Sequence, residues 1–201
     1  MKAKTDFLYY ITAALLVVTS YFFFDLPVIN FFKPLKNTFT YDFFKVVTEF
    51  GRAEYQIVPA ILVYIVFRKK RPFVAKIGLA VALSSALAGL STDVIKFIVG
   101  RYRPSMYFSE GLYGFAFFEY KYAMVSFPSG HSSTALGALG LLSLVFKRFR
   151  WVFLSIGAMI ALSRVVTLHH YFSDIIAGSA IGMASAIFIY NKMKLYKGTK
   201  E

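Results

Sequence analysis

The chain has 201 residues, of which 58% are hydrophobic and 19% aromatic, with a mean hydropathy of +0.60 and a formal net charge of +13. This composition is too apolar for an ordinary soluble domain, and the lack of cysteine excludes disulfides and thiolate metal sites. The basic residues form short clusters between apolar runs rather than one patch, which indicates membrane topology and argues against nucleic acid as a partner.

Six apolar runs follow one another along the chain. A spanning helix needs about 20 largely apolar residues, so the shorter runs must borrow flanking residues. The second run is the weakest because it is short and contains Pro59. The first run has a basic start but no small-residue cleavage site after it, so we expect it to remain as a helix. The runs are 7–24, 55–67, 77–99, 132–146, 151–167 and 171–190.

These runs predict an all-α polytopic membrane protein with six transmembrane helices in one bundle, and we expect 1–201 to be a single domain. The first loop, at 38–50, places Phe39, Phe43 and Phe50 at helical spacing with charged residues on the other side. We expect it to form an interfacial helix.

The distribution of charge predicts the orientation. If the N-terminus is cytoplasmic, the inside segments hold 14 basic and two acidic residues, and the outside segments hold 7 basic and six acidic residues, Asp25 and Arg101 among them. Cytoplasmic loops carry the excess of lysine and arginine. We therefore expect both termini in the cytoplasm, and the loops after the first, third and fifth runs on the outer face of the cytoplasmic (inner) membrane.

Three short motifs fall at this outer face: 96–104 (KFIVGRYRP), 128–131 (PSGH) and 163–174 (SRVVTLHHYFSD). Ionisable residues near the helix ends of so apolar a chain usually mark a functional site. Two histidines and three permanent cations, without a carboxylate cluster, indicate a site for phosphate. The candidate site residues are Lys96, Arg103, Ser129, Gly130, His131, Arg164, His170 and Asp174.

The spacing of His170 and Asp174 places them one turn apart on a helix. The carboxylate can keep one imidazole nitrogen protonated and leave the other as a nucleophile. His131 is then available as the acid that protonates a leaving oxygen.

The remaining candidates suit the binding of an anion. Ser129 and Gly130 precede an apolar run, where the free N–H groups and the dipole of a helix N-terminus favour a phosphate. Arg103 and Arg164 can hold phosphate oxygens bidentately, and Lys96 adds a point charge.

Each feature has another interpretation. Asp174 can be a helix-start charge, Lys96 can extend to the interface, and Pro-Ser-Gly is also ordinary turn chemistry. His131, His170 and Asp174 can form a two-histidine, one-carboxylate metal site, which the three cations disfavour. A transporter is a further alternative, although it predicts charges at the membrane midplane rather than at one face.

Taken together, the motifs resemble the type 2 phosphatidic acid phosphatases, or lipid phosphate phosphatases. The pattern of that family is Lys, six residues, Arg-Pro; then Pro-Ser-Gly-His; then Ser-Arg, five residues, His, three residues, Asp. Every position is matched between Lys96 and Asp174. The resemblance implies a nucleophilic His170 oriented by Asp174, an acid–base His131, and a phosphate held by Lys96, Arg103, Ser129, Gly130 and Arg164.

The resemblance also implies a metal-independent phosphatase without a cofactor, acting on a lipid phosphate or diphosphate among membrane lipids. Candidate substrates are undecaprenyl diphosphate, phosphatidylglycerol phosphate, lipid A 1-phosphate and phosphatidic acid. A phosphotransferase that passes the phosphoryl group to another lipid could have identical motifs, and the sequence does not separate the two.

Overall fold

The computed structural model describes residues 2–197, and the side chains of residues 8–196. The described residues are helical throughout apart from turns, loops and one isolated bridge between Arg101 and Phe115, so the all-α prediction is confirmed. The helices are α1 (Lys2–Phe23), α2 (Asp25–Phe32), α3 (Phe39–Glu49), α4 (Ala53–Phe67), α5 (Pro72–Val99), α6 (Pro104–Glu110), α7 (Gly130–Val145), α8 (Arg150–Val166) and α9 (Phe172–Lys192). Short 3-10 turns occupy Lys33–Leu35, Tyr122–Met124, Lys147–Phe149 and Leu195–Lys197.

Each of the six predicted runs coincides with a helix: α1, α4, α5, α7, α8 and α9. Among the described residues, three helices are long and apolar enough to cross a membrane, and up to five if each bent pair forms one span. The bent pairs are α1 with α2, at 61°, and α3 with α4, at 41°. Helix α7 is shorter, with 16 residues.

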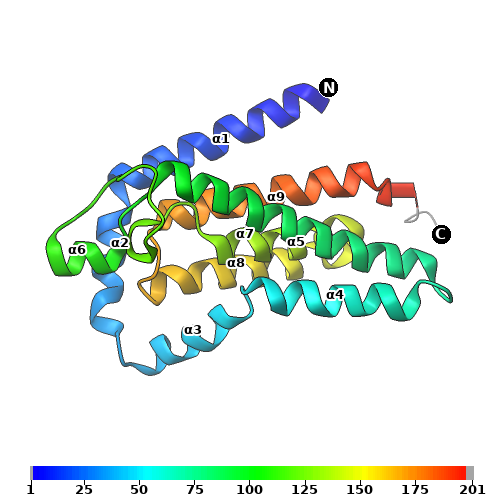
Figure 1. Ribbon diagram of the computed structural model, residues 1–201, viewed down its shortest axis with the longest axis horizontal. Helices are drawn as coiled ribbons and strands as arrows, with labels where there is room; N and C mark the ends of the chain where they lie inside the picture. Colours follow the sequence, from blue (N-terminus) through cyan, green and yellow to red (C-terminus); the bar gives the residue numbers. More distant parts are fainter. Residues whose placement is uncertain (1, 198–201) are drawn as a thin grey trace.

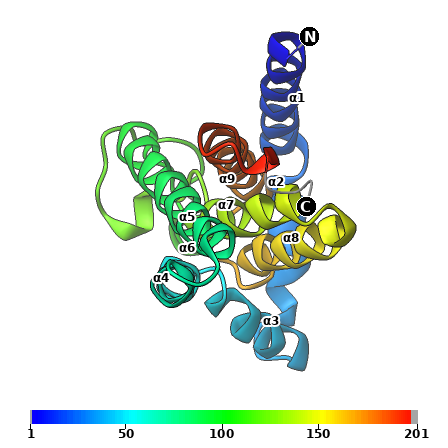
Figure 2. The same cartoon turned by 90° about the vertical axis from the view of Figure 1, so that its right-hand side faces the viewer.

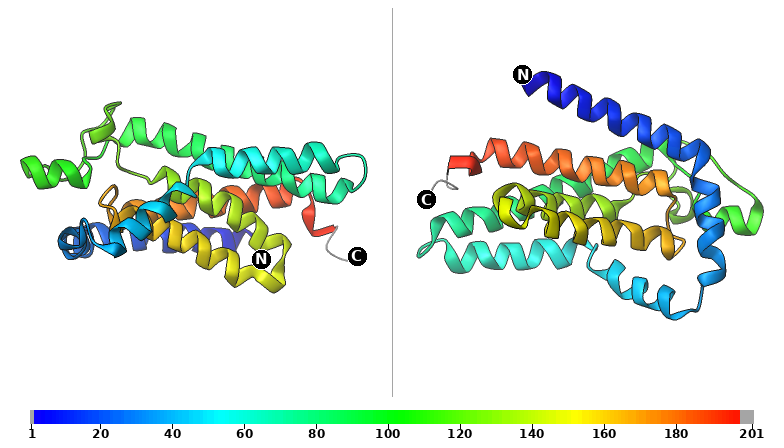
Figure 3. Two further views of the ribbon diagram at one scale, coloured as in Figure 1. Left: turned by 90° about the horizontal axis from the view of Figure 1, so that it is seen from below. Right: turned by 180° about the vertical axis from the view of Figure 1, so that it is seen from behind.

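The long helices run side by side, so that the chain alternates between two ends of the bundle (Figure 1). The start of α1, the end of α9 and the α4–α5 and α7–α8 turns lie at one end. Helices α2 and α6, together with the starts of α7 and α9, lie at the other end, which we call the motif end (Figures 1 and 3).

Helix α7 occupies the middle of the bundle and packs against α5, α8 and α9, as the end-on view shows (Figure 2). Small residues bring α7 and α9 together. A Cβ at Gly178 would overlap the carbonyl oxygen of Ser129, and one at Gly182 would overlap that of Ser133. Since lipid gives little hydrophobic drive for helices to associate, such close backbone packing holds a membrane bundle together.

Helix α3 begins after Thr38, whose hydroxyl accepts a hydrogen bond from the Tyr41 N–H at 3.5 Å, a standard helix N-cap. Phe39, Phe43 and Val46 are exposed on its outer side, whereas Val47 packs against α7 and α8. The expected helix at 38–50 therefore exists.

Candidate functional site

The site residues predicted from sequence meet at the motif end of the bundle. Lys96 comes from the last turn of α5, Arg103 from the loop after it, and Arg164 from the last turn of α8. His170 lies in the short α8–α9 loop, four residues after Val166, where α8 ends, and Asp174 lies in the first turn of α9. Arg103, Arg164, His170 and Asp174 are all buried.

His170 presents its two ring nitrogens to different partners. Nδ1 lies 3.4 Å from Asp174 Oδ2, and Nε2 lies 3.4 Å from Arg103 Nη1. Asp174 itself is held by the Tyr171 N–H at 2.9 Å and the Ser126 hydroxyl at 2.6 Å, both on Oδ2. With its proton kept on Nδ1 by the carboxylate, His170 directs the Nε2 lone pair toward the arginine side of the site.

Arg103 is fixed by backbone carbonyls rather than by carboxylates. Its Nε donates to Tyr122 O at 2.7 Å and its Nη1 to His169 O at 2.9 Å, while the Tyr122 ring lies 3.9 Å below the guanidinium. Carbonyls orient the guanidinium of Arg103 without neutralising it, so its positive charge remains available for an anion.

The guanidinium of Arg164 is likewise held without a carboxylate partner among the described residues. Its Nη1 donates to the Thr48 hydroxyl at 2.6 Å, and its buried Nε has no hydrogen-bond partner in the part of the chain that the structure describes. Among the described residues, neither Arg103, Arg164 nor Lys96 forms an ion pair with a carboxylate. A buried donor without a partner is costly, and a bound oxyanion would satisfy it.

The start of α7 faces these cations. A Cβ at Gly130 would lie only 3.6 Å from Lys96 Nζ, so the ammonium lies directly over the glycine. The N–H groups of Gly130 and His131 donate to no carbonyl in the described residues. Free N–H groups beside a cation form a binding site for phosphate oxygens.

Ser129 is the N-cap of α7, at the helix N-terminus where the sequence predicts a phosphate ligand. Its N–H donates to Asp174 O at 3.0 Å, and its hydroxyl accepts from the Ser132 N–H at 3.4 Å and the Ser132 hydroxyl at 2.9 Å. Ser129 caps α7 and ties it to α9, which leaves only its own hydroxyl proton for a ligand.

His131 lies against the turn between α3 and α4. A Cβ at Gly51 would lie 2.9 Å from His131 Cβ, and Thr134 donates to Gly51 O at 2.7 Å. This contact places α3 and α4 beside the site.

The pKa of His170 lies well below its ordinary value of 6.5, first because the ring is buried and then because of the charges of Arg103, Arg164, Lys96 and His131. Burial, and then the charges of Arg164 and Arg103, lower the pKa of His169 to about 4. Both rings are therefore neutral at neutral pH, as a nucleophilic imidazole must be.

Sequence analysis missed two residues of this region. Arg101 and Asp25 counted only as loop charges, yet both are fully buried and paired at 2.7 Å. Arg101 also binds Asp174 Oδ1 at 2.5 Å. The available signals in the sequence were an arginine two residues before Arg103 and an aspartate, Asp25, at the end of the first apolar run.

No group of three histidine, aspartate or glutamate side chains in the described residues is arranged to hold a metal ion. Both carboxylate oxygens of Asp174 already accept hydrogen bonds, from Arg101 on one side and from Ser126 and Tyr171 on the other. The alternative metal site at His131, His170 and Asp174 therefore lacks a free carboxylate oxygen.

Comparison with known families assigns the fold. The sequence profile of the PAP2 superfamily matches residues 73–196, a region that contains all three motifs. The chain belongs to the PAP2 superfamily. Asp25, Thr48 and Gly51 lie outside the matched region.

Curated relatives include the lipid A 1-phosphatase of Rhizobium johnstonii, 36% identical over 110 residues that cover 55% of this chain and 45% of that protein. The undecaprenyl-diphosphatase of Sulfolobus acidocaldarius is 30% identical over 137 residues, 67% of this chain and 62% of that protein. The chain spans about half the length of the first relatives it matches.

Two solved structures share the fold. A transmembrane PAP2-type phosphatidylglycerolphosphate phosphatase from Bacillus subtilis superposes with a TM-score of 0.68 at 18% identity, covering 96% of this chain and 95% of that one. Aquifex aeolicus LpxE superposes with a TM-score of 0.58 at 18% identity, covering 83% and 94%. With its long apolar helices and this fold, the chain is an integral membrane protein.

Proposed function

We propose that this protein is a membrane lipid phosphatase that hydrolyses a phosphomonoester or diphosphate head group through a phosphohistidine at His170. The supporting observation is that Arg103 lies at Nε2 of a neutral His170, while Arg164 and Lys96 are near enough to lower its pKa. None of the three cations forms an ion pair with a carboxylate among the described residues. Family membership and the phosphatases among its relatives point to the same chemistry.

The proposed reaction has two steps. Nε2 of His170 attacks phosphorus as the bond to the leaving oxygen breaks, and His131 donates a proton to that oxygen. His131 then takes a proton from water, whose oxygen attacks phosphorus and releases inorganic phosphate and His170. Lys96, Arg103, Arg164 and the N–H groups of Gly130 and His131 stabilise the equatorial oxygens in both steps. Ser129 contributes its hydroxyl proton and positions the turn.

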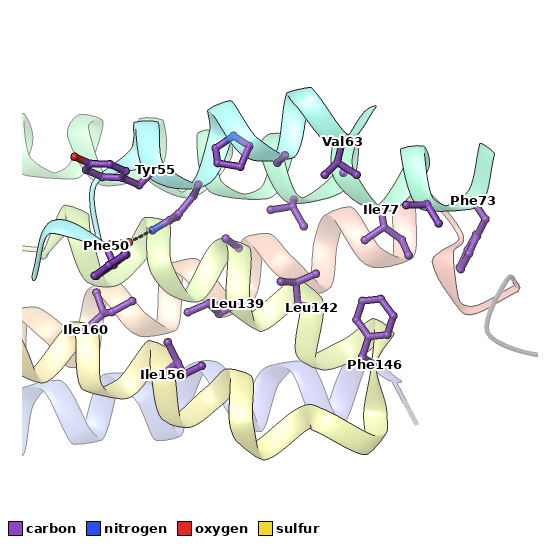
Figure 4. A pocket seen from close by; sticks show the side chains of 17 residues that line it. Phe50, Tyr55, Val63, Phe73, Ile77, Leu139, Leu142, Phe146, Ile156 and Ile160 are labelled. Atoms are coloured by element: carbon purple, nitrogen blue, oxygen red, sulfur yellow. Dashed lines mark hydrogen bonds between the residues drawn. The ribbon is translucent and has the colours of Figure 1, made fainter. Parts of the chain in front are cut away.

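A groove beside the site suits the hydrocarbon chain of the substrate. It has a volume of about 610 Å³ and lies between α4, α5, α7 and α8 (Figure 4). Phe50, at one end, precedes the Gly51 turn that contacts His131, and Phe73 and Phe146 lie at the other end. Its lining is apolar except for Gln56 and the Tyr55 hydroxyl. An acyl or prenyl chain here would place its phosphate near His131.

The proposed topology has six spans, formed by α1, α4, α5, α7, α8 and α9, with α3 in the outer interface. Both termini and the basic α4–α5 and α7–α8 turns would be cytoplasmic, in the cytoplasmic (inner) membrane, and the motif end would face the periplasm or cell exterior. The charge asymmetry of the loops supports this orientation. The whole chain then forms one catalytic domain.

Phosphate release by the purified protein in detergent tests the proposal. Undecaprenyl diphosphate, phosphatidylglycerol phosphate, lipid A 1-phosphate and phosphatidic acid are supplied in turn, with and without a strong chelator and with vanadate. We expect release from at least one lipid that survives the chelator and falls with vanadate. Loss in chelator that a divalent metal restores would instead favour a metal enzyme, and absence of release from every lipid would contradict the proposal.

A phosphotransferase is the second candidate, because the same phosphohistidine can pass its phosphoryl group to a lipid alcohol instead of water. Product analysis with a second lipid present separates the two: a phosphatase yields inorganic phosphate, and a transferase yields a newly phosphorylated lipid. A transporter would move labelled lipid or phosphate across vesicles without cleaving it.

A further inference from the structure

We propose that Arg101 is a positioning residue for the reaction, which sets the Asp174 carboxylate against His170, and that Asp25 in turn holds Arg101. This inference rests on the proposed phosphohistidine chemistry. It concerns two residues outside the matched motif positions, one of which, Asp25, lies outside the region that the family profile matches.

The guanidinium of Arg101 is divided between two acids. Its Nη1 donates to Asp174 Oδ1 at 2.5 Å and to the Ser173 hydroxyl at 2.7 Å, and its Nη2 donates to Asp25 Oδ2 at 2.7 Å. The Arg101, Asp25 and Asp174 side chains are all 0% exposed. Only a planar fork can satisfy two carboxylates on separate helices in this way.

The fork also fixes the rotation of the Asp174 carboxylate. Oδ1 accepts a hydrogen bond from Arg101. Oδ2 accepts from the Tyr171 N–H and the Ser126 hydroxyl and faces Nδ1 of His170. If Oδ1 lost its partner, the carboxylate could rotate away from the imidazole, and the proton on Nδ1 would no longer be held while Nε2 attacks phosphorus.

Aromatic rings enclose Arg101 and keep water from replacing it. The rings of Tyr171, Tyr21, Tyr113 and Phe115 have their centroids 4.3, 4.9, 5.3 and 5.5 Å from the guanidinium carbon. In so dry a site, a charge-assisted hydrogen bond is stronger than in water. The two acids also raise the pKa of Arg101 above its ordinary value despite its burial, so it stays charged.

Asp25 reaches this position because the chain bends by 61° between α1 and α2. Its Oδ1 accepts the Ser173 N–H at 2.7 Å and its Oδ2 accepts the Ser173 hydroxyl at 2.6 Å. Asp25 therefore holds both Arg101 and the residue next to Asp174, and α2 supports the start of α9.

The central test compares Arg101→Gln with the double variant Asp25→Asn/Arg101→Gln, both as purified full chains that pass size exclusion and thermal unfolding checks. Arg101→Gln should lower kcat about 100-fold with KM changed by less than about twofold, because both Nη atoms of Arg101 already donate to carboxylates. The double variant keeps the net charge of the cluster and should stay as slow. Recovery of wild-type kcat in the double variant would mean that Arg101 only neutralises Asp25, and would overturn the proposal.

Companion variants sharpen the comparison. Arg101→Lys should be intermediate, because an ammonium supplies one point charge where two carboxylates need a fork. Arg103→Gln should raise KM as well as lower kcat, because Arg103 lies on the Nε2 side of His170. Arg148→Gln makes the same chemical change at an exposed position on the opposite end of the bundle and should leave both constants unaltered.

Two measurements cover the case in which Arg101→Gln does not fold. Asp25→Asn preserves side-chain shape and should lower kcat about tenfold with KM unchanged; wild-type kcat would overturn the role of Asp25. Nitrogen-15 NMR of histidine-labelled protein should show His170 protonated on Nδ1 in the wild type and a mixture of tautomers in Arg101→Lys. An unaltered tautomer in Arg101→Lys would overturn the role of Arg101, whether or not a lipid substrate has been found. Inactivity of the wild type toward every lipid would count against the proposed function alone.

Discussion

The guanidinium of Arg103 lies 3.4 Å from Nε2 of His170, the ring nitrogen that does not face Asp174. One imidazole is therefore placed between a carboxylate and a cation. An oxyanion bound by the cation lies within reach of the nitrogen that attacks it.

The first prediction concerns protonation of His170. Its pKa lies well below 6.5, chiefly through burial and then through nearby cations, so it should remain neutral as the pH falls through 6.5. The chain has only three histidines, so single substitutions assign their NMR signals. The signals of His170 should not titrate between pH 8 and pH 6, and that of His169 should titrate near pH 4. A midpoint at or above 6.5 for His170 would contradict this.

The lowered pKa values of His170 and His169 should make the stability of the folded protein depend on pH. The folded protein keeps His170 and His169 neutral, whereas the unfolded chain binds protons there below about pH 6.5. Because the unfolded state then binds more protons, stability should fall as the pH drops below 6.5. Thermal unfolding in detergent at pH 7.5 and pH 5.5 measures this, and His169→Gln should reduce the difference.

The second prediction concerns the close contact of α7 with α9. Gly178→Ala would force a methyl group into the Ser129 carbonyl, and we expect a loss of about 1–3 kcal/mol of stability together with reduced turnover, because the turn that carries Gly130 and His131 must shift. Gly89→Ala is the milder comparison, since its new methyl would meet a side-chain atom, Thr134 Cγ2 at 3.3 Å, rather than backbone. Equal behaviour of the two variants would show that the contact is not tight.

The third prediction concerns sidedness, and the absence of native cysteine makes the test clean. Ser109→Cys, on exposed α6 at the motif end, should react with a membrane-impermeant thiol reagent in intact cells. Lys70→Cys, in the exposed α4–α5 turn, should react only after the membrane is opened. The reverse pattern would place catalysis in the cytoplasm and move the substrate to the inner leaflet.

Much of this structure could be predicted from the sequence, because its signals are local. The apolar runs predicted the long helices. The four-residue spacing of His170 and Asp174 predicted that their side chains meet, which they do at 3.4 Å, but His170 lies in the loop before α9 and not on a helix face as expected. Thr38 and the amphipathic pattern after it marked α3 as a helix.

The missed features depend on contacts between distant segments. Asp25 meets Arg101 across 76 positions, and Thr48 meets Arg164 across 116, so no local pattern shows either pair. The bend after Phe23 that turns Asp25 inward falls at the end of the first apolar run, where a charged residue is equally typical of an ordinary loop. Ser129 was expected at the phosphate, and its role as an N-cap competes with that use of its hydroxyl.

The most direct test of the central claim is to trap the phosphoenzyme. Purified protein is mixed with a lipid carrying phosphorus-32 in its head group, quenched in base within the first turnover, and digested for peptide mapping. We expect an acid-labile label on His170, no label and no turnover in His170→Ala, and a label that persists longer in His131→Ala when the leaving group is good. Full turnover in His170→Ala, or a label on another residue, would contradict the mechanism.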